Sequence, residues 1–155
     1  MDWCSSVLPA RREAFLGALS EEERPLYECL FDLEGKEGYR WKTNPKSFTL
    51  YLEMPQRPIW MAEVEDVGHR DARSIYIFMH DVERHVNGGD ELADYLARRF
   101  DQVGLLHISS SHHHHNRVIV PGTLFDIEHL NRLEEAFAEA SRAIQEHGLR
   151  PSSAR

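Results

Sequence analysis

The segment Phe48-Thr-Leu-Tyr-Leu-Glu-Met54 carries the clearest structural signal in the chain, and it is followed by Pro55-Gln-Arg-Pro58 and Ile59-Trp-Met-Ala-Glu-Val64. Apolar side chains recur at every second position from Phe48 to Met54, and alternate residues of a strand point to the same face. The proline-bounded loop favours a return of the chain. We therefore expect an antiparallel hairpin with one face packed against a core.

Two further segments extend this hairpin into a meander. Residues 39–43 are short and aromatic and precede the turn signal Asn44-Pro45, whereas residues 73–80 are rich in β-branched and aromatic side chains. Two short apolar runs, at 105–109 and 117–121, predict a last hairpin with a polar tip. The sequence thus predicts an antiparallel β-meander of about four to six strands.

Apolar residues at helical spacing predict helices on both sides of these strands. Shorter helices are expected over residues 10–19, 24–34 and 90–104, and residues 126–147 predict a long amphipathic helix that closes the chain. The apolar seam of this last helix should face either the sheet or a second copy of itself. The seam consists of Leu130, Leu133, Phe137, Ala140 and Ile144.

Length and composition are those of one folded domain. A chain of 155 residues, 41% hydrophobic and 28% charged, needs no metal or disulfide merely to hold it together. We expect a flexible arm over residues 1–8, a single α+β domain over 9–148 with the meander packed against helices, and a flexible tail over 149–155. This outline is similar to that of several interaction modules, including dedicated secretion chaperones, and no residue motif accompanies the likeness.

The formal net charge is −8, and residues 1–37 carry nine acidic side chains against four basic ones. An acidic body repels phosphate backbones, so general nucleic-acid binding is disfavoured. The two cysteines form no spaced motif, and we find neither a secretory signal nor an apolar run of membrane-spanning length. We therefore expect a cytoplasmic protein with no membrane partner.

The histidines form the most unusual pattern in the chain. Four are consecutive within a serine-flanked loop, one lies on the preceding strand, and two stand five residues apart at the end of the expected fourth strand. Imidazoles bind zinc and other divalent transition metals, so these residues could serve a metal-binding protein or a metal-dependent hydrolase. The same residues fit a solvated loop tip and a polar strand end. The candidate ligands are His80, His85, His107, His112, His113, His114 and His115.

Four carboxylates on the central hairpin and just after it, Glu53, Glu63, Glu65 and Asp66, invite comparison with the magnesium ligands of metal-dependent nucleases. No lysine stands two residues after these acids. The same four residues are also typical of outward-facing carboxylates on a sheet with one solvated face. The chain also lacks a glycine-rich phosphate loop and a convincing nucleophile triad.

A patch that combines flat rings with cations occupies the expected first strand and the turn after it. Rings and cations together can stack bases and hold phosphates, contact an acidic protein, or bind a small anionic ligand. They can equally belong to an edge strand in which lysine discourages unwanted strand pairing. The candidate partner-binding residues are Tyr39, Arg40, Trp41, Lys42 and Lys46.

The absence of a catalytic constellation and the acidity of the expected helices favour a non-enzymatic macromolecular binding module. Such a protein would be an adaptor, an inhibitor or a chaperone-like protein that presents an acidic surface to another protein, needs no cofactor, and could form a homodimer. The alternatives are the histidine-centred metalloprotein or hydrolase, with zinc or a similar metal, and a nucleic-acid contact through the basic and aromatic patch.

Overall fold

The computed structural model describes residues 3–66, 74–108 and 115–151, and within these ranges it describes the side chains from residue 9 onward. The described residues form five helices and one six-stranded sheet. The elements are α1 (Trp3–Gly17), α2 (Arg24–Phe31), β1 (Tyr39–Asn44), β2 (Ser47–Leu52), β3 (Ile59–Glu65), β4 (Ile75–Ile77), α3 (His80–His85), α4 (Gly89–Asp101), β5 (His107–Ile108), β6 (Arg117–Ile119) and α5 (Ile127–His147).

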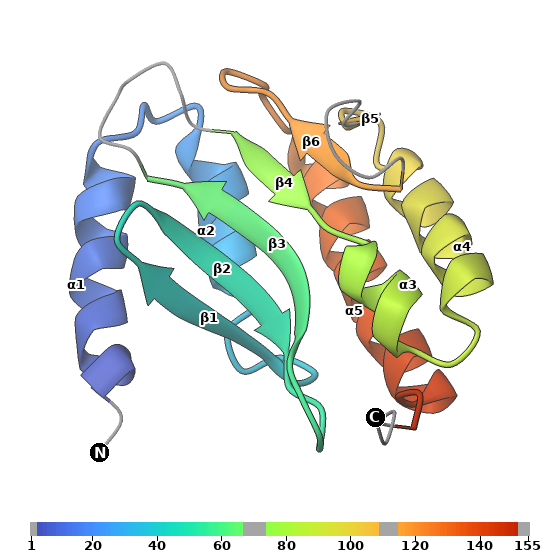
Figure 1. The fold of residues 1–155 in the computed structure, drawn as a ribbon. Helices are drawn as coiled ribbons and strands as arrows, with labels where there is room; N and C mark the ends of the chain where they lie inside the picture. Colours follow the sequence, from blue (N-terminus) through green and yellow to red (C-terminus); the bar gives the residue numbers. More distant parts are fainter. Residues whose placement is uncertain (1–2, 67–73, 109–114, 152–155) are drawn as a thin grey trace.

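The sheet is antiparallel throughout, with the strand order β1-β2-β3-β4-β6-β5 (Figure 1). The first four strands follow each other as a meander, as the sequence predicts. The last hairpin consists of β5 and β6. Its second strand, β6, pairs with β4, where Tyr76 lies opposite Val118, so the two-residue β5 forms the edge of the sheet. The predicted α+β fold with an antiparallel sheet and a long closing helix is confirmed.

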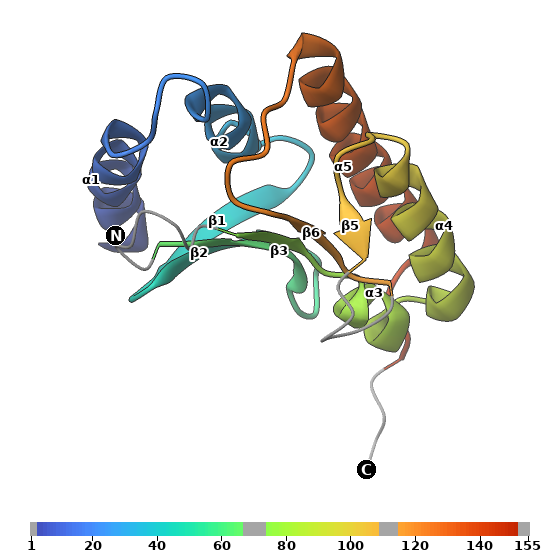
Figure 2. The same ribbon diagram turned by 90° about the horizontal axis from the view of Figure 1, so that it is seen from above.

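Four helices lie on one face of the sheet. In Figure 2, α1 and α2 stand over the β1 side and α4 and α5 stand over the β6 side, while the opposite face carries no helix layer in the described residues. The short helix α3 lies beside the end of β3. One face of the sheet is therefore the core face.

The period-two pattern of the central hairpin sets which face is core. Phe48, Leu50 and Leu52 are fully buried, as predicted, whereas Tyr51 between them is only half-buried. The Phe48 ring lies 5.5 Å from the ring of Phe15 on α1 and 5.1 Å from a phenylalanine ring of α2. Such edge-on aromatic pairs attach the first two helices to the strands.

The closing helix packs its seam against the rest of the same chain. Leu133, Phe137 and Ile144 are completely buried. The Phe137 ring lies 4.9 Å from Phe100 on α4 and 5.8 Å from Tyr39 on β1, whose hydroxyl donates to the Phe137 carbonyl oxygen at 2.6 Å. Most of the seam is thus packed within the chain, and Leu130 at its start is half-buried. The predicted packing against the sheet is present, and the homodimer stays a prediction.

A short helix replaces the end of the predicted fourth strand. Only residues 75–77 pair as β4, and His80 begins α3 instead of ending a strand. Because β4 has turned away, the main-chain amide of Trp60 donates to the Asp81 carboxylate at 3.0 Å rather than to a neighbouring strand. The α3–α4 junction needs Gly89, because a Cβ there would lie 2.3 Å from the Val82 carbonyl oxygen.

Both ends of the domain extend beyond their predicted limits. Helix α1 begins at Trp3 and runs through Pro9, so residues 3–8 are helical rather than an irregular arm. A proline inside a helix removes one main-chain hydrogen bond, and the helix here continues despite that loss. At the other end, Leu149 forms a bridge with Val86, and the Arg150 amide donates to the His85 carbonyl at 2.8 Å. The predicted tail is therefore attached to α3 at its start.

Phe137→Ala should lower the free energy of unfolding by about 3–5 kcal/mol, because it leaves a cavity where α4, α5 and β1 meet. Urea denaturation followed by circular dichroism measures this loss. Glu135→Ala is the matched control on the exposed face of the same helix, and a change within about 0.5 kcal/mol is expected for it. A loss for Phe137→Ala no larger than that of the control would contradict this packing.

Candidate functional site

The described candidate histidines lie at separate places. His80 and His85 stand at the two ends of α3, where their rings contact Arg84 (3.3 Å) and Arg57 (3.2 Å), and His107 is exposed on β5. The pKa of His85 is lowered by its partial burial and by the neighbouring Arg57 guanidinium. Among the described residues, no three histidine, cysteine or acidic side chains gather in a metal-binding arrangement.

His115 joins α3 to α4. Its Nδ1 lies 3.3 Å from a Glu83 carboxylate oxygen and its Nε2 lies 3.6 Å from an Asp94 oxygen. This ring bridges two acidic side chains of the fold, which accounts for its half-buried position. The predicted ligands His112, His113 and His114 lie outside the described residues, so the proposed metal site stays a prediction.

Three of the four carboxylates that the sequence compared with nuclease magnesium ligands each contact a different partner. Glu53 accepts from Arg40 at 3.2 Å, Glu65 accepts from the main-chain amide of Ser74 at 3.2 Å, and Asp66 pairs with Arg11 at 3.0 Å. Three of the four carboxylates therefore have partners in different parts of the fold, and they supply no convergent magnesium site.

The predicted basic and aromatic patch is divided between the two faces of the sheet. Tyr39 and Trp41 are 1% and 5% exposed, and the Trp41 indole donates to the Leu30 carbonyl at 3.0 Å. Arg40 and Lys42 point outward because side chains alternate along β1, and Lys46 is exposed at the turn. The rings of the patch are core residues, and its cations lie on the surface, where Arg40 is paired with Glu34 and Glu53.

Sequence reasoning missed the rings that do lie beside these cations. Tyr51 on β2 and Trp60 on β3 are paired across the strands, with ring centroids 6.1 Å apart, and the Lys42 ammonium lies 5.8 Å from the Trp60 centroid. These three side chains and the loop 53–58 surround a cleft of about 450 Å³. We call it the sheet-face cleft. The sequence pattern that could have indicated this cleft is the position of Tyr51, which alternates with the buried residues of β2.

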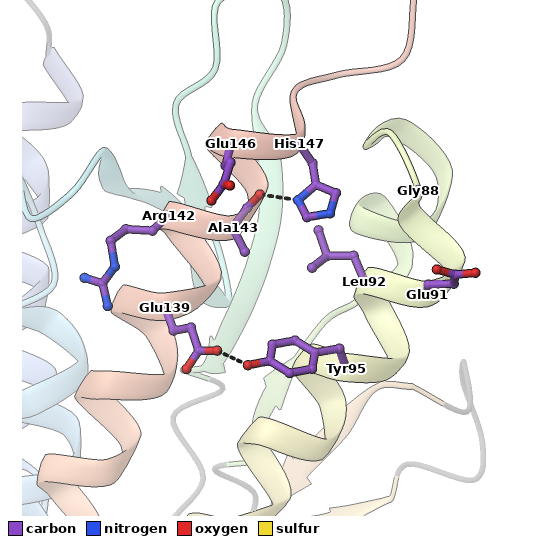
Figure 3. A pocket seen from close by; sticks show the side chains of 9 residues that line it. All are labelled: Gly88, Glu91, Leu92, Tyr95, Glu139, Arg142, Ala143, Glu146 and His147. Carbon is purple, nitrogen blue, oxygen red and sulfur yellow. Dashed lines mark hydrogen bonds between the residues drawn. The ribbon is translucent and has the colours of Figure 1, made fainter.

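A second hollow, the α4–α5 groove, lies between the helices α4 and α5 (Figure 3). It has a volume of about 620 Å³ and is formed by one side of each helix. Apolar groups lie between the helices, with carboxylates on both walls. Its lining consists of Gly88, Glu91, Leu92, Tyr95, Glu139, Arg142, Ala143, Glu146 and His147.

Tyr95 and Glu139 connect the two walls of this groove. The Tyr95 hydroxyl donates to one Glu139 oxygen, and Arg99 donates to the other at 2.6 Å (Figure 3). The hydrogen bond from Tyr95, helped by Arg99, lowers the pKa of Glu139 below 4.5, and the same bond raises the pKa of Tyr95 above 10.0. Glu139 therefore stays ionised and Tyr95 stays protonated at neutral pH.

The basic residues of the groove are turned to other contacts. Arg142 pairs with Glu37 at 3.2 Å, on the side away from α4, and the His147 ring donates to the Ala143 carbonyl at 2.8 Å. Glu91 and Glu146 have no ion-pair partner within the part of the chain that the structure describes. The groove consequently presents acidic rims around an apolar floor.

Comparison with protein-family models, with curated proteins and with solved structures finds no significant match to this chain. Separately, the helices of the described ranges include none that is both long and apolar enough to cross a lipid bilayer.

Tyr95→Phe should raise the pKa of Glu139 toward 4.5, because it removes the hydrogen bond that favours the ionised form. The folded-state pKa of Glu139 is depressed, so its contribution to stability is complete above about pH 4.5 and is lost as the pH falls through the folded-state pKa. Carbon-detected NMR of the Glu139 carboxyl group over a range of pH measures the midpoint of its titration. Tyr51→Phe, on the other face of the sheet, is the control, and equal midpoints in both variants would contradict the contact.

Zinc content should not depend on the α3 histidines, because among the described residues neither His80 nor His85 belongs to a group of three or more potential metal ligands. Elemental analysis of untagged protein, purified without a nickel column, should therefore give the same metal content for wild type, His80→Ala and His85→Ala. Loss of about one bound metal per chain in either variant would support the metalloprotein alternative instead.

Proposed function

We propose that this protein is a non-enzymatic binding module that receives a basic, amphipathic segment of another protein in the α4–α5 groove. The observation that carries this proposal is the groove itself, with an apolar floor between two helices and, on each rim, a carboxylate without an ion-pair partner among the described residues. It would act as an adaptor, an inhibitor or a chaperone-like protein through its acidic surface.

The floor of the groove suits the apolar face of a helix. Leu92 and Ala143 lie between the helices, and Tyr95 is 50% exposed although its ring is held by Glu139. A third helix laid between two others contacts both, and amphipathic helices bind protein grooves in this way. Because Tyr95 is already positioned, little side-chain entropy would be lost when a partner covers it.

The charge of the molecule favours a cationic partner. Residues 1–37 carry nine acidic against four basic side chains and residues 89–155 carry ten against seven, whereas residues 38–88 carry seven of each. The net negative charge thus belongs to the segments that supply α1, α2, α4 and α5. A field of this sign accelerates encounter with basic proteins and repels nucleic acid.

The alternatives have less support in the described residues. The histidines, the hairpin carboxylates and the two cysteines supply no group of three or more ligands there. The Cys29 thiol has its pKa raised to about 11, chiefly by burial, so it is a weak nucleophile. The rings of the predicted nucleic-acid patch are buried. Binding rather than catalysis is therefore the function that we propose.

A synthetic amphipathic helix with leucine on one face and lysine on the other should bind the protein, and Glu91→Lys combined with Glu146→Lys should weaken it by at least about tenfold. Fluorescence anisotropy of the labelled peptide measures the affinity. Raising the ionic strength from about 0.1 M to about 1 M should also weaken binding, because the screening length falls from about 10 Å to about 3 Å.

Glu13→Lys combined with Glu22→Lys is the matched control, since both residues are exposed, one on α1 and one in the turn between α1 and α2, and both lie outside the groove. It makes the same change in total charge and should alter the affinity by less than about threefold. Tyr95→Ala tests the apolar floor and should weaken binding without a change in net charge. If both double variants lose affinity for the peptide equally, the binding is nonspecific charge attraction and the proposed site is rejected.

A further inference from the structure

The sheet-face cleft is lined by Tyr51 and Trp60, which alternate with the buried residues of β2 and β3 and so face away from the core. Figure 2 shows the helix layer on the core side of these strands. We infer that the cleft binds an acidic segment of a partner protein, with an apolar or aromatic side chain of that segment lying against Tyr51 and Trp60. This inference stands on different residues from the α4–α5 groove and does not depend on it.

The rings supply the apolar part of this surface. Tyr51 and Trp60 are half-buried, face the same side of the sheet, and meet at an angle of 60°. Met54, which the sequence placed on the buried face of the hairpin, lies beyond the end of β2, where it is partly buried against the core and also lines the cleft. Tryptophan, tyrosine, methionine and arginine are the side chains most enriched in protein interfaces, and tryptophan most often dominates their affinity.

The cleft is held in shape before any partner arrives. The Trp60 main chain is fixed by the Asp81 carboxylate, which accepts its amide at 3.0 Å. Pro55 and Pro58 restrict the backbone of the loop that forms one wall. On the same wall, the Arg57 guanidinium contacts the His85 ring at 3.2 Å. Binding to such a surface loses less conformational entropy than binding to a mobile loop.

The charges of the cleft select the partner. Lys42 and Arg57 flank the rings, and neither has a carboxylate within ion-pair distance among the described residues. The one acidic side chain of the lining, Glu53, is paired with Arg40 at 3.2 Å. Two cations without an ion-pair partner among the described residues, beside half-buried rings, are complementary to carboxylates flanking an apolar side chain.

A protein segment suits these charges better than a nucleic acid. Affinity for a nucleic acid comes largely from many cations along a phosphate backbone, and here two cations stand on a molecule with a net charge of −8. A short acidic peptide brings only the carboxylates that the two cations can pair, so the distant acidic helices repel it less, because salt screens such repulsion beyond about 8 Å.

Peptide display tests this inference with random sequences as the probe. Random peptides are selected on the immobilised protein, with the Trp60→Ala protein used to remove peptides that bind elsewhere. The selected peptides should be rich in aspartate and glutamate next to an aromatic or leucine side chain. In fluorescence anisotropy, Lys42→Glu and Arg57→Glu should each weaken a selected peptide by about tenfold.

Lys46→Glu is the matched control, because Lys46 is exposed on the same hairpin at the opposite end of β2 and lies outside the cleft. It should change the affinity by less than about twofold. The groove variant Glu91→Lys with Glu146→Lys should not weaken the same peptide, which separates this site from the proposed function. If Trp60→Ala fails to fold by circular dichroism, Lys42→Glu replaces it in the selection.

Several outcomes would overturn the inference. Selected peptides rich in lysine and arginine, or peptides that the Trp60→Ala protein binds equally well, would show that the cleft does not bind acidic segments. Binding of single-stranded oligothymidylate that Lys42→Glu abolishes, with no peptide selected, would assign the surface to nucleic acid instead. Equal weakening by Lys46→Glu and Lys42→Glu would leave only general charge attraction.

Discussion

Phe137 is the side chain on which the architecture depends, because three elements meet at its ring. It contacts Phe100 of α4 and Tyr39 of β1, and its own carbonyl accepts the Tyr39 hydroxyl. A completely buried hydroxyl must find such a partner, and burial also raises the pKa of Tyr39, which keeps the phenol protonated as a donor. The closing helix is thereby attached to the first strand, although the two are far apart in the sequence.

This packing gives the molecule two unlike faces. Helices cover one side of the sheet and bring the net negative charge with them, and the strands on the other side carry balanced charges and half-buried rings. The two hollows differ in the same way: the α4–α5 groove has carboxylates on its rims, and the sheet-face cleft has cations beside its rings. The two binding surfaces that we propose therefore have opposite charge preferences, which would suit an adaptor that joins two partners.

Local patterns predicted the fold better than the site. The alternation from Phe48 to Leu52 identified the buried face, and on the same strand it would have placed Tyr51 on the opposite face. The same rule applied to β1 would have placed Tyr39 and Trp41 together on one face, which is the core face. The short helix α3 was missed because its six residues are largely polar and follow a strand-like run. The groove could not be predicted, because Glu91 and Glu146 are distant in sequence and line one groove only when α4 packs on α5.

The sequence alone determined the elements whose signals are periodic and local, namely the central hairpin and the amphipathic closing helix. The structure adds that Asp126 caps this helix by accepting the His129 amide at 2.9 Å. Only the tertiary structure decided which charges are neutralised by a neighbour. Arg40 and Lys42 are neighbours on the same strand with similar exposure, yet Arg40 is neutralised by Glu34 and Glu53 whereas Lys42 lies over Trp60. Pairing of charges depends on contacts across strands and loops, and such contacts leave no local pattern in the chain.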